Sequence, residues 1–354
     1  MKEQPHSLLL HRLKAQLVHF RQLSARVAEN YIRPMLLKRF IQHVSGPKTV
    51  EYGRNEVLAL CVVRNGAAYI RSFVQHHFEL GVRHIVFLDN GSTDDTVAIA
   101  QEYDNITILE ANCPYHKYEN VMKRYLAHRF SQGKWALFVD IDELFDYPFS
   151  DVLSLPSLIA YLNHYSYTAV VAQMLDMFPD TTLSGLWTMT TGDCLKEAYP
   201  YYDVSNIRKS DYLWGKLSNP SVKRYHGGIR DTLFGTNNGL TKVALFFVDE
   251  HIDLFVKWHH VNNAYIADFT GVLLHYPFVS SFSQKVLEAV ETRRYGYFTI
   301  QYELYWKTLQ EDPQRRIRLD TAHVLTTIKS LLDTGFLVAS PNFLQWVAVN
   351  RKNL

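Results

Sequence analysis

Two aspartates, Asp140 and Asp142, have the residue type and spacing best suited to chemistry in this sequence. They directly follow an apolar run at 135–139 that is typical of a buried strand. Side chains at positions i and i+2 of an extended segment face the same side, so both carboxylates should converge. Such oxygen ligands suit Mg²⁺ or Mn²⁺, which can offset the charge on a departing diphosphate. The alternative is that this Asp-x-Asp pair only caps a turn.

A second acidic position lies in the stretch Phe-Leu-Asp-Asn-Gly-Ser-Thr-Asp-Asp-Thr at 87–96. Asp89 ends a predicted strand, where its carboxylate can accept hydrogen bonds from a nucleobase imide or a ribose hydroxyl. The alternative is an ordinary strand–turn–helix. In that case Ser92 or Thr93 is the N-cap, and acidic residues in the first turn suit the helix dipole.

Three basic side chains could offset the charge of a bound diphosphate: Arg64, Lys123 and Arg124. Arginine is favoured where a bidentate contact to an anion is needed. For Lys123 and Arg124, a solvated helix face is the alternative interpretation.

Histidines occur at two further positions of interest. His275 ends an apolar run at 271–275, where a lone histidine is either a ligand or a satisfied core residue. His259 and His260 are adjacent, and neighbouring residues on a strand point to opposite faces. They are therefore not expected to bind one metal together. Contact of one of them with an acceptor is an alternative to a structural role.

The elements that position these residues follow an alternating pattern in the first half of the chain. Buried strands are predicted at 57–63, 84–88, 106–109 and 135–139, with helices at 67–80, after 93 and at 118–131. Alternating strands and helices predict an α/β fold with a mostly parallel twisted sheet, flanked by helices. Ligands of such sheets bind beyond the carboxyl ends of the strands.

The pattern loosens beyond residue 150. Strands are predicted at 168–175, 242–248 and 271–275, and helices at 281–312 and 320–335.

The N-terminal part is basic. Residues 1–54 contain ten Lys/Arg and three Asp/Glu, a balance of +7 that leaves −5 for the remainder of a chain with formal charge +2. Residues 6–44 predict one or two amphipathic helices, broken or kinked at Pro34. Such a segment could lie on an anionic membrane surface or pack on the body as a helical hairpin. The net acidic body argues against nucleic-acid binding.

The spacing of the cysteines and the distribution of apolar residues indicate the cellular compartment of the protein. Cys61, Cys113 and Cys194 are widely spaced and form no CxxC pair, which fits unpaired thiols in a reducing environment. The sequence has no signal-peptide layout and no run of about eighteen uncharged apolar residues that would predict a transmembrane helix. We therefore expect a cytoplasmic protein, with peripheral contact at the inner membrane face as an option.

Taken in order and spacing, the stretch at 87–96 and the Val-Asp-Ile-Asp-Glu run at 139–143 resemble family-2-type GT-A glycosyltransferases. The match is closest to a bacterial branch whose first strand ends in an Arg/Lys-Asn turn, which reads Val-Arg-Asn here. The resemblance covers 55–147 strongly and continues weakly at 227–235 and 273–276. Two departures are Gly66, where an acidic residue is common, and Asn90, where many relatives have a second aspartate.

This resemblance implies a GT-A fold, a nucleotide-sugar donor, a divalent metal (Mn²⁺ or Mg²⁺) and a glycan or lipid-linked saccharide acceptor. Asp89 would contact the nucleoside, Asp140 would face the ribose or the ion, and Asp142 would bind the ion. His275 would be a late metal or phosphate ligand. Assembly of a bacterial surface polysaccharide would be the natural setting.

An inverting transfer needs a general base near the acceptor hydroxyl. In related enzymes a carboxylate lies about as far beyond the Asp-x-Asp as Asp231 does here. Asp231 is the first candidate for the base, with Arg230 as its charge partner or a phosphate contact. The rivals are Asp176, Asp193 and Glu197, and a salt-bridged loop acid is the alternative role for Asp231.

We therefore expect a basic helical segment at 1–54, a GT-A domain at 55–280 and a C-terminal helical extension at 281–354. Within the domain, 55–147 would bind the nucleotide and 148–280 the acceptor. One competing interpretation is a nucleotidyltransferase on a similar fold, although the turn after the first strand lacks repeated glycines. Another is a non-catalytic GT-A-like binding protein. Carboxylates gathered without a cation would be costly there.

Overall fold

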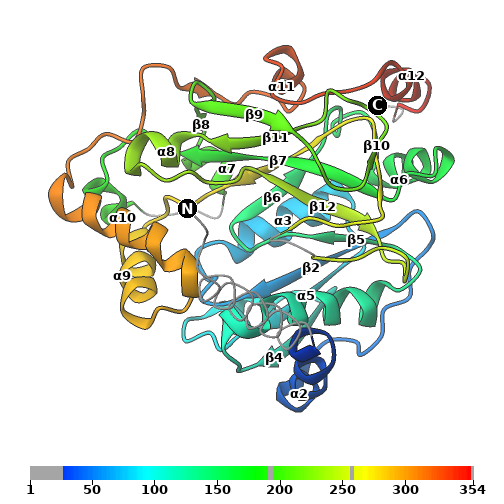
Figure 1. The fold of residues 1–354 in the computed structure, drawn as a ribbon, viewed down its shortest axis with the longest axis horizontal. Helices are drawn as coiled ribbons and strands as arrows, with labels where there is room; N and C mark the ends of the chain where they lie inside the picture. Colours follow the sequence, from blue (N-terminus) through cyan, green and yellow to red (C-terminus); the bar gives the residue numbers. More distant parts are fainter. Residues whose placement is uncertain (1–26, 190–193, 256–258, 352–354) are drawn as a thin grey trace, which may run out of the picture.

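The computed structural model describes residues 27–189, 194–255 and 259–351. Helices lie on both sides of a central twisted sheet (Figure 1). The strands are β1 (Ile41–Ser45), β2 (Val57–Val63), β3 (His84–Asp89), β4 (Ile106–Ala111), β5 (Trp135–Phe138), β6 (Glu143–Asp146), β7 (Ala169–Phe178), β8 (Tyr201–Tyr202), β9 (Ile207–Asp211), β10 (Lys216–Leu217), β11 (Lys223–Gly227), β12 (Thr241–Phe247), β13 (Tyr265–Ile266), β14 (Gly271–His275) and β15 (His323–Val324).

Helices alternate with these strands along the described chain. They are η1 (Ala28–Ile32), α2 (Arg33–Phe40), α3 (Ile70–Leu80), α4 (Thr96–Ala100), α5 (Tyr115–Ser131), α6 (Leu155–His164), η2 (Ser184–Thr188), α7 (Leu195–Ala198), α8 (Ile229–Phe234), α9 (Phe282–Thr292), η3 (Gly296–Phe298), α10 (Thr299–Glu311), α11 (Ser330–Asp333) and α12 (Pro341–Val349).

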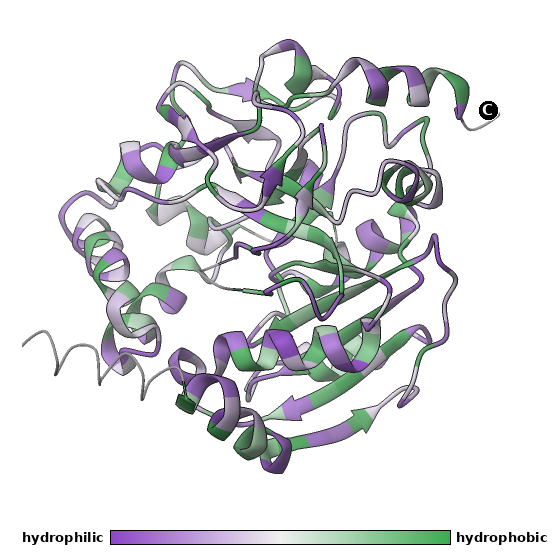
Figure 2. Cartoon of the chain, turned by 45° about the vertical axis from the view of Figure 1, so that its right-hand side comes forward, coloured by the Kyte–Doolittle hydropathy of each residue, from purple (hydrophilic) through white to green (hydrophobic). Residues whose placement is uncertain are grey.

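The first half of the sheet consists of four parallel strands in the order β4-β3-β2-β5. Every residue of β2 is buried, because helices cover both faces of the strand. Its odd-numbered residues pack with Phe73 of α3, and its even-numbered residues pack with Leu126 of α5. In Figure 2 the strands are mainly hydrophobic in colour, whereas α5 alternates between hydrophobic and hydrophilic positions. The predicted α/β class is confirmed.

The second half of the sheet is mixed. β12 lies antiparallel between β5 and β7. β14 runs parallel to β7 and antiparallel to β6. This arrangement places His275, at the end of β14, opposite Glu143 and Asp176. Strands distant in sequence therefore end near the carboxyl edge of β5.

A third apolar cluster joins the C-terminal helices to the sheet. Phe234 of α8, Phe282 of α9 and Tyr305 of α10 pack with Phe178 at the end of β7. This cluster fixes α9 and α10 at the side of the molecule where β7 ends (Figure 1).

Several local expectations need correction. Residues 41–45 are not helical, because they form β1, which pairs antiparallel with β4. Pro34 lies in the first turn of α2, where its missing N–H costs nothing. Residues 320–335 contain only β15 and the short α11. The predicted helical residues 6–26 lie outside the described residues.

The cap of α4 also differs from expectation. The helix begins at Thr96 rather than after residue 93. Thr96 N donates to Asp94 Oδ1 at 3.1 Å. The side chain that accepts from the first backbone N–H of the helix is therefore Asp94 rather than Ser92 or Thr93. The end of α3 at Gly81 is as expected, with φ of 107° at its C-cap.

Candidate active site

A cavity of about 600 Å³ opens beyond the carboxyl ends of β2 and β5. Residues from the first half of the chain, from 174–277 and from the C-terminal helices all contribute to its wall. The lining residues that bear ionisable side chains or amides are Arg64, Asn90, Tyr115, Glu119, Asn120, Asp140, Asp142, Glu143, Arg224, His226, Arg230, Asn237, Asn238, Lys242, His259, His260, His275, Lys285, Arg294, Tyr295, Gln301, Tyr302 and Tyr305.

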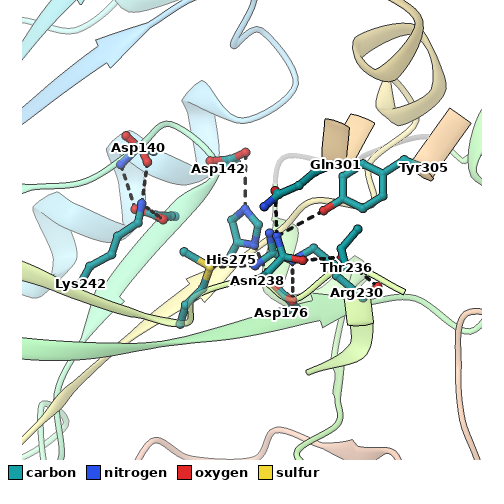
Figure 3. A network of polar contacts seen from close by, with 12 residues as sticks. Asp140, Asp142, Asp176, Arg230, Thr236, Asn238, Lys242, His275, Gln301 and Tyr305 are labelled. Atoms are coloured by element: carbon teal, nitrogen blue, oxygen red, sulfur yellow. Dashed lines mark hydrogen bonds and ion pairs between the residues drawn. The ribbon is translucent and has the colours of Figure 1, made fainter. Parts of the chain in front are cut away.

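Asp140 and Asp142 both line this cavity, as the local pattern predicted. Strand β5 ends at Phe138, so the two residues lie in the turn that leads into β6. Asp140 Oδ2 accepts from Lys242 Nζ at 2.6 Å, and the same ammonium contacts Glu143 (Figure 3). Glu143 Oε2 in turn accepts from Asp140 N at 3.0 Å. Lys242 therefore holds this turn by bridging two of its three carboxylates.

Asp142 contacts two side chains that arrive from the C-terminal part. Its Oδ2 accepts from Lys285 Nζ of α9 at 3.0 Å and lies 3.7 Å from His275 Nε2. His275 Nδ1 contacts Asp176 Oδ1 at 2.6 Å, as Figure 3 shows. The structure thus brings together Asp140, Asp142 and His275.

Burial and neighbouring charges set the protonation of this centre. Burial opposes ionisation of Asp142, but Lys285 and His275 outweigh it and hold the pKa of Asp142 well below its usual range. Burial likewise disfavours the protonated form of His275. Its hydrogen bonds to Asp142 and Asp176 outweigh this effect and raise the pKa of its ring. Burial raises the pKa of Glu143 despite Lys242. The centre therefore tends to keep Asp142 as a carboxylate.

The metal-binding side chains in the cavity match a hard divalent cation only in part. Among the described residues, no group of three or more His, Cys, Asp or Glu side chains could hold a metal ion. However, Mg²⁺ is usually bound through one or two carboxylates together with substrate phosphates. Asp140 and Asp142 supply such a pair, with side chains 30% and 11% exposed. They fit an ion that arrives with a diphosphate.

Two further residues of the first half, Arg64 and Asn90, line the cavity. Arg64 lines it, with Nη2 3.2 Å from Glu288 of α9. Asn90 lines it too, and its Oδ1 accepts from Arg294 Nη2 at 2.9 Å. Its Nδ2 donates to Ala111 O at 2.7 Å. Asn90, a departure from the family pattern, therefore anchors an arginine of the C-terminal segment.

Asp89 is placed differently from expectation. It is 3% exposed and is not among the residues that line the cavity. Its Oδ2 accepts from Gly91 N at 3.0 Å and Ser92 N at 2.9 Å. The carboxylate is thus used to shape its own turn, and the direct nucleoside contact expected for Asp89 is corrected to a positioning role.

The predictions for Arg124 and Lys123 also need correction. Arg124 does not line the cavity, and its Nη2 bonds Glu29 Oε1 of η1 at 3.0 Å. Lys123 is only 1% exposed and bonds Glu119 Oε1 at 2.7 Å, so it is not on a solvated face. Helix α5 thus directs Arg124 to η1, whereas Lys123 pairs with Glu119, a residue of the cavity lining.

The pair Arg230 and Asp231 is not arranged as expected. Arg230 lines the cavity but donates from Nε to Asp176 Oδ2 at 2.7 Å. Asp231 lies outside the lining and pairs with Arg208 at 2.8 Å. Adjacent residues of α8 point in different directions, so the structure does not bring Asp231 to the acceptor site. The role of candidate base is therefore withdrawn from Asp231.

The rival acids are no better placed. Asp176 is 3% exposed in side chain and engaged by Arg230 and His275. Glu197 is exposed and does not line the cavity. Asp193 lies outside the described residues.

His259 and His260 both line the cavity, although opposite faces were expected. The segment is not a strand, and His259 has φ of 129°, so the alternation of a strand does not apply. His260 stacks on Trp214 with ring centroids 3.7 Å apart and planes inclined by 7°.

Sequence reasoning missed Lys242, Lys285, Arg224, Arg294 and His226. Each lies far along the chain from the aspartates, on elements with no recognised motif. One local signal was available for Lys242, which is a charged residue near the start of an otherwise apolar run.

Comparison with known proteins matches residues 60–207 to the family described as "Glycosyl transferase family 2". A glycosyltransferase family 92 protein of Ricinus communis is 27% identical over 156 residues, which cover 41% of this chain and 27% of the relative. The chain thus spans about a quarter of that relative's length. The family match includes Arg64, Asp140 and Asp142 and ends before Arg230 and His275.

Solved structures give weaker likenesses. A mannosyltransferase from Pyrobaculum calidifontis, solved with GDP-Man and Mn²⁺, is 19% identical, with a TM-score of 0.25 over 42% of this chain and 45% of that one. A glucosyl-3-phosphoglycerate synthase from Mycobacterium tuberculosis is 18% identical, with a TM-score of 0.22 over 35% of this chain and 44% of that one. The predicted α/β GT-A class agrees with the observed sheet and the family match.

Proposed function

We propose that this chain is a glycosyltransferase that moves a sugar from a nucleotide-sugar donor to a hydroxyl of a glycan or lipid-linked saccharide, with inversion. The observation that carries this proposal is the position of Asp140 and Asp142. Both carboxylates lie beyond the end of a parallel strand, line a cavity of about 600 Å³ and fall inside the glycosyl transferase family 2 match.

In this proposal, residues 55–147 bind the nucleotide and 148–280 bind the acceptor. Asp140 and Asp142 hold Mn²⁺ or Mg²⁺ together with the diphosphate, and His275 completes the ligand set. When bound, this ion stabilises the charge that develops on the departing diphosphate. Arg64, Lys285 and Arg294 line the same part of the cavity and provide further positive charge. Residues 281–354 are thus more than an extension, since α9 supplies part of the donor site.

Proton removal from the acceptor requires a base other than Asp231. His226 lines the cavity on β11, and its ring makes no hydrogen bond to another described residue. Burial, together with Arg224 and Arg208, lowers the pKa of His226, so the ring is neutral at pH 7. We assign it as proton acceptor. The acceptor oxygen bonds the anomeric carbon as the bond to the diphosphate breaks, and the hydroxyl proton passes to His226.

A donor screen tests the proposal. UDP- and GDP-sugars would be assayed for binding and slow hydrolysis with Mn²⁺ and with Mg²⁺. Because metal-assisted charge stabilisation is worth several kcal/mol, Asp142→Asn should lower hydrolysis by about 10²-fold. Asp211→Asn, which changes a carboxylate side chain that is 80% exposed and does not line the cavity, is the matched control.

The screen can fail in distinct ways. Nucleotide binding without dependence on a divalent ion would remove the metal from the proposal. Release of pyrophosphate from a nucleoside triphosphate in the presence of a sugar phosphate would favour nucleotidyl transfer. Absence of binding by every nucleotide tested would end the proposal.

A second proposal concerns residues 1–54, of which 27–54 are described. We propose that this segment makes peripheral contact with an anionic membrane. Tyr31, Ile32 and Met35 are 69%, 51% and 72% exposed, and basic residues lie in the last turn of α2. An apolar surface flanked by Lys and Arg suits the boundary between headgroups and acyl chains. No helix in the described part of the chain is long and apolar enough to cross a membrane.

A further inference from the structure

The cations that line the cavity differ in how they are paired. Most of them have a carboxylate of this chain within ion-pair distance: Lys242 has Asp140, Lys285 has Asp142, Arg230 has Asp176, and Arg64 has Glu288. Arg224 and Arg294 line the cavity without forming an ion pair to any described carboxylate. These two arginines therefore retain positive charge available to a ligand.

The two arginines lie in different halves of the cavity. Arg294 bonds Asn90 at 2.9 Å and lies over the ring of Tyr115 at 5.3 Å, which places it at the nucleotide end. Arg224 lies on β11, whose next residue, Tyr225, accepts from Leu240 N and donates from N to Thr241 Oγ1, both at 2.8 Å. Arg224 is thus attached to the start of β12, in the acceptor half.

Arg224 is held in place by an aromatic stack rather than by a carboxylate. Its guanidinium carbon lies 5.1 Å from the ring centroid of Trp214. This indole also stacks on the parallel ring of His260 at 3.7 Å and contacts the Tyr212 ring edge-on at 5.4 Å. Stacking of this kind orients a planar guanidinium and leaves its N–H groups free to donate. A guanidinium fork so presented matches a carboxylate or a phosphate by two parallel hydrogen bonds.

A diphosphate at Asp140 and Asp142 would already have Arg64, Lys285 and Arg294 as partners in the nucleotide half. Arg224 would remain without an anion on the acceptor side. His226 and His260 line the same region and offer imidazole nitrogens beside the guanidinium. A neutral acceptor that covered Arg224 would remove water from this cation without pairing it, which is unfavourable for a desolvated charge.

We infer that the acceptor carries an anionic group, a carboxylate or a phosphate on a sugar, and that Arg224 binds it from its stack on Trp214. This inference rests on the proposed glycosyl transfer and specifies its acceptor class. Arg224 is then a specificity-determining residue, while His226 next to it removes the proton from the reacting hydroxyl.

The test measures binding of matched saccharides to the full chain by NMR, with and without a nucleoside diphosphate. The probes are methyl glucuronide, glucose 6-phosphate and neutral methyl glucoside. Because hydrogen bonds to charged groups are strong, we expect the wild type to bind at least one anionic probe about 10- to 100-fold more tightly than the neutral probe. The two anionic probes distinguish a carboxylate from a phosphate.

Three variants separate specific binding from damage to the fold. Arg224→Ala should abolish the preference, and so should Arg224→Gln, whose planar amide can still lie on Trp214 but has no charge. Arg129→Ala is the matched control, because Arg129 also stacks on an aromatic ring, at 5.8 Å from the Tyr125 centroid, but lies outside the cavity lining. It should keep the preference.

The outcomes are separable from those of the donor screen. Equal binding of neutral and anionic probes by the wild type, or a preference that survives in both Arg224 variants, would overturn the inference even if nucleotides bind normally. Failure of every nucleotide to bind would instead remove the proposed transferase function. If no nucleotide bound but the wild type still preferred the anionic probes, Arg224 would be an anion-binding residue of a site with another function.

Discussion

At the scale of single residues, the centre depends on a lysine that bridges two acids. Lys242 is 9% exposed in side chain and contacts Asp140 and the fully buried Glu143. Burial acts against the charged lysine, but the two acids outweigh it and raise its pKa. A carboxylate pair so close in space is stable only while a cation lies between its members.

Replacing Lys242 should therefore be costly for stability. We expect Lys242→Met to lower the free energy of unfolding by about 3–5 kcal/mol, since it leaves buried carboxylates without their partner. Urea denaturation at pH 7 measures this change. Lys223→Met is the control, because Lys223 pairs with the exposed Asp211 and its loss should have little effect. Similar losses in both variants would show that Lys242 does not stabilise the turn.

His226 provides a second test at this scale. His226→Gln should reduce kcat for transfer by about 10²- to 10⁴-fold, because general base catalysis contributes that much. Binding of the nucleoside diphosphate should stay as in the wild type. His251→Gln, a change at an exposed histidine outside the cavity lining, should leave kcat unaltered. Retention of wild-type kcat by the His226 variant would transfer the role of proton acceptor to another group.

At the scale of elements, a histidine fastens α3 to β6, the strand that follows the Asp-x-Asp turn. His77 is fully buried. Its Nδ1 lies 2.8 Å from Phe73 O, and Phe145 N donates to its Nε2 at 3.3 Å. The second contact needs a neutral ring with Nε2 unprotonated. Burial lowers the pKa of His77 to about 4, which is consistent with this tautomer.

This linkage predicts sensitivity to acid. Below the ordinary histidine pKa of about 6.5, the unfolded chain binds a proton at His77 and the folded chain does not, so stability falls as pH falls. The loss should accumulate between pH 6.5 and about 4 and reach about 3 kcal/mol. Urea denaturation across this range should show a shallower pH dependence for His77→Gln than for the wild type.

A control histidine keeps this test specific, since other buried histidines also respond to acid. His128 is exposed and bonds Gln132, the residue that follows α5. The His128→Gln variant should reproduce the wild-type pH dependence. An identical slope for the wild type and His77→Gln would contradict the assignment of His77 as an acid-sensitive link between α3 and β6.

At the scale of the whole molecule, the cavity is built from segments separated by most of the chain. The C-terminal helices α9 and α10 stand beside the ends of the sheet strands (Figure 1) and bring Lys285 and Arg294 to residues of the first half. The described part of the basic N-terminal segment, residues 27–54, lies elsewhere, with α2 packed beside α5 and β4. Its exposed apolar residues Tyr31, Ile32 and Met35 do not line the cavity.

The membrane proposal belongs to this scale. The full chain should float with vesicles that contain phosphatidylserine and much less with neutral phosphatidylcholine vesicles, because anionic lipid attracts nearby Lys and Arg. The double change Tyr31→Glu with Met35→Glu should weaken flotation about 10-fold or more. Leu213→Glu, at a residue that is 80% exposed on another part of the surface, should not. Equal flotation of all three proteins would contradict contact through η1 and α2.

Local patterns in the sequence determined a large part of this molecule. Continuous apolar runs identified β2 to β5, because strands covered on both faces need apolar side chains throughout. The two aspartates after β5 located the centre, since a strand of a parallel sheet ends where ligands bind. The same local reasoning mistook β1 for a helix, because an edge strand of five residues has little periodic signal.

Only the tertiary structure decided which charges meet. Lys242 reaches Asp140 across 102 positions and Lys285 reaches Asp142 across 143, through strand order and helix packing that no local pattern encodes. The same packing directed Arg230 toward Asp176 and left Asp231 with Arg208. Residue types with chemical potential are readable along the chain, whereas their partners depend on which distant elements bury surface against each other.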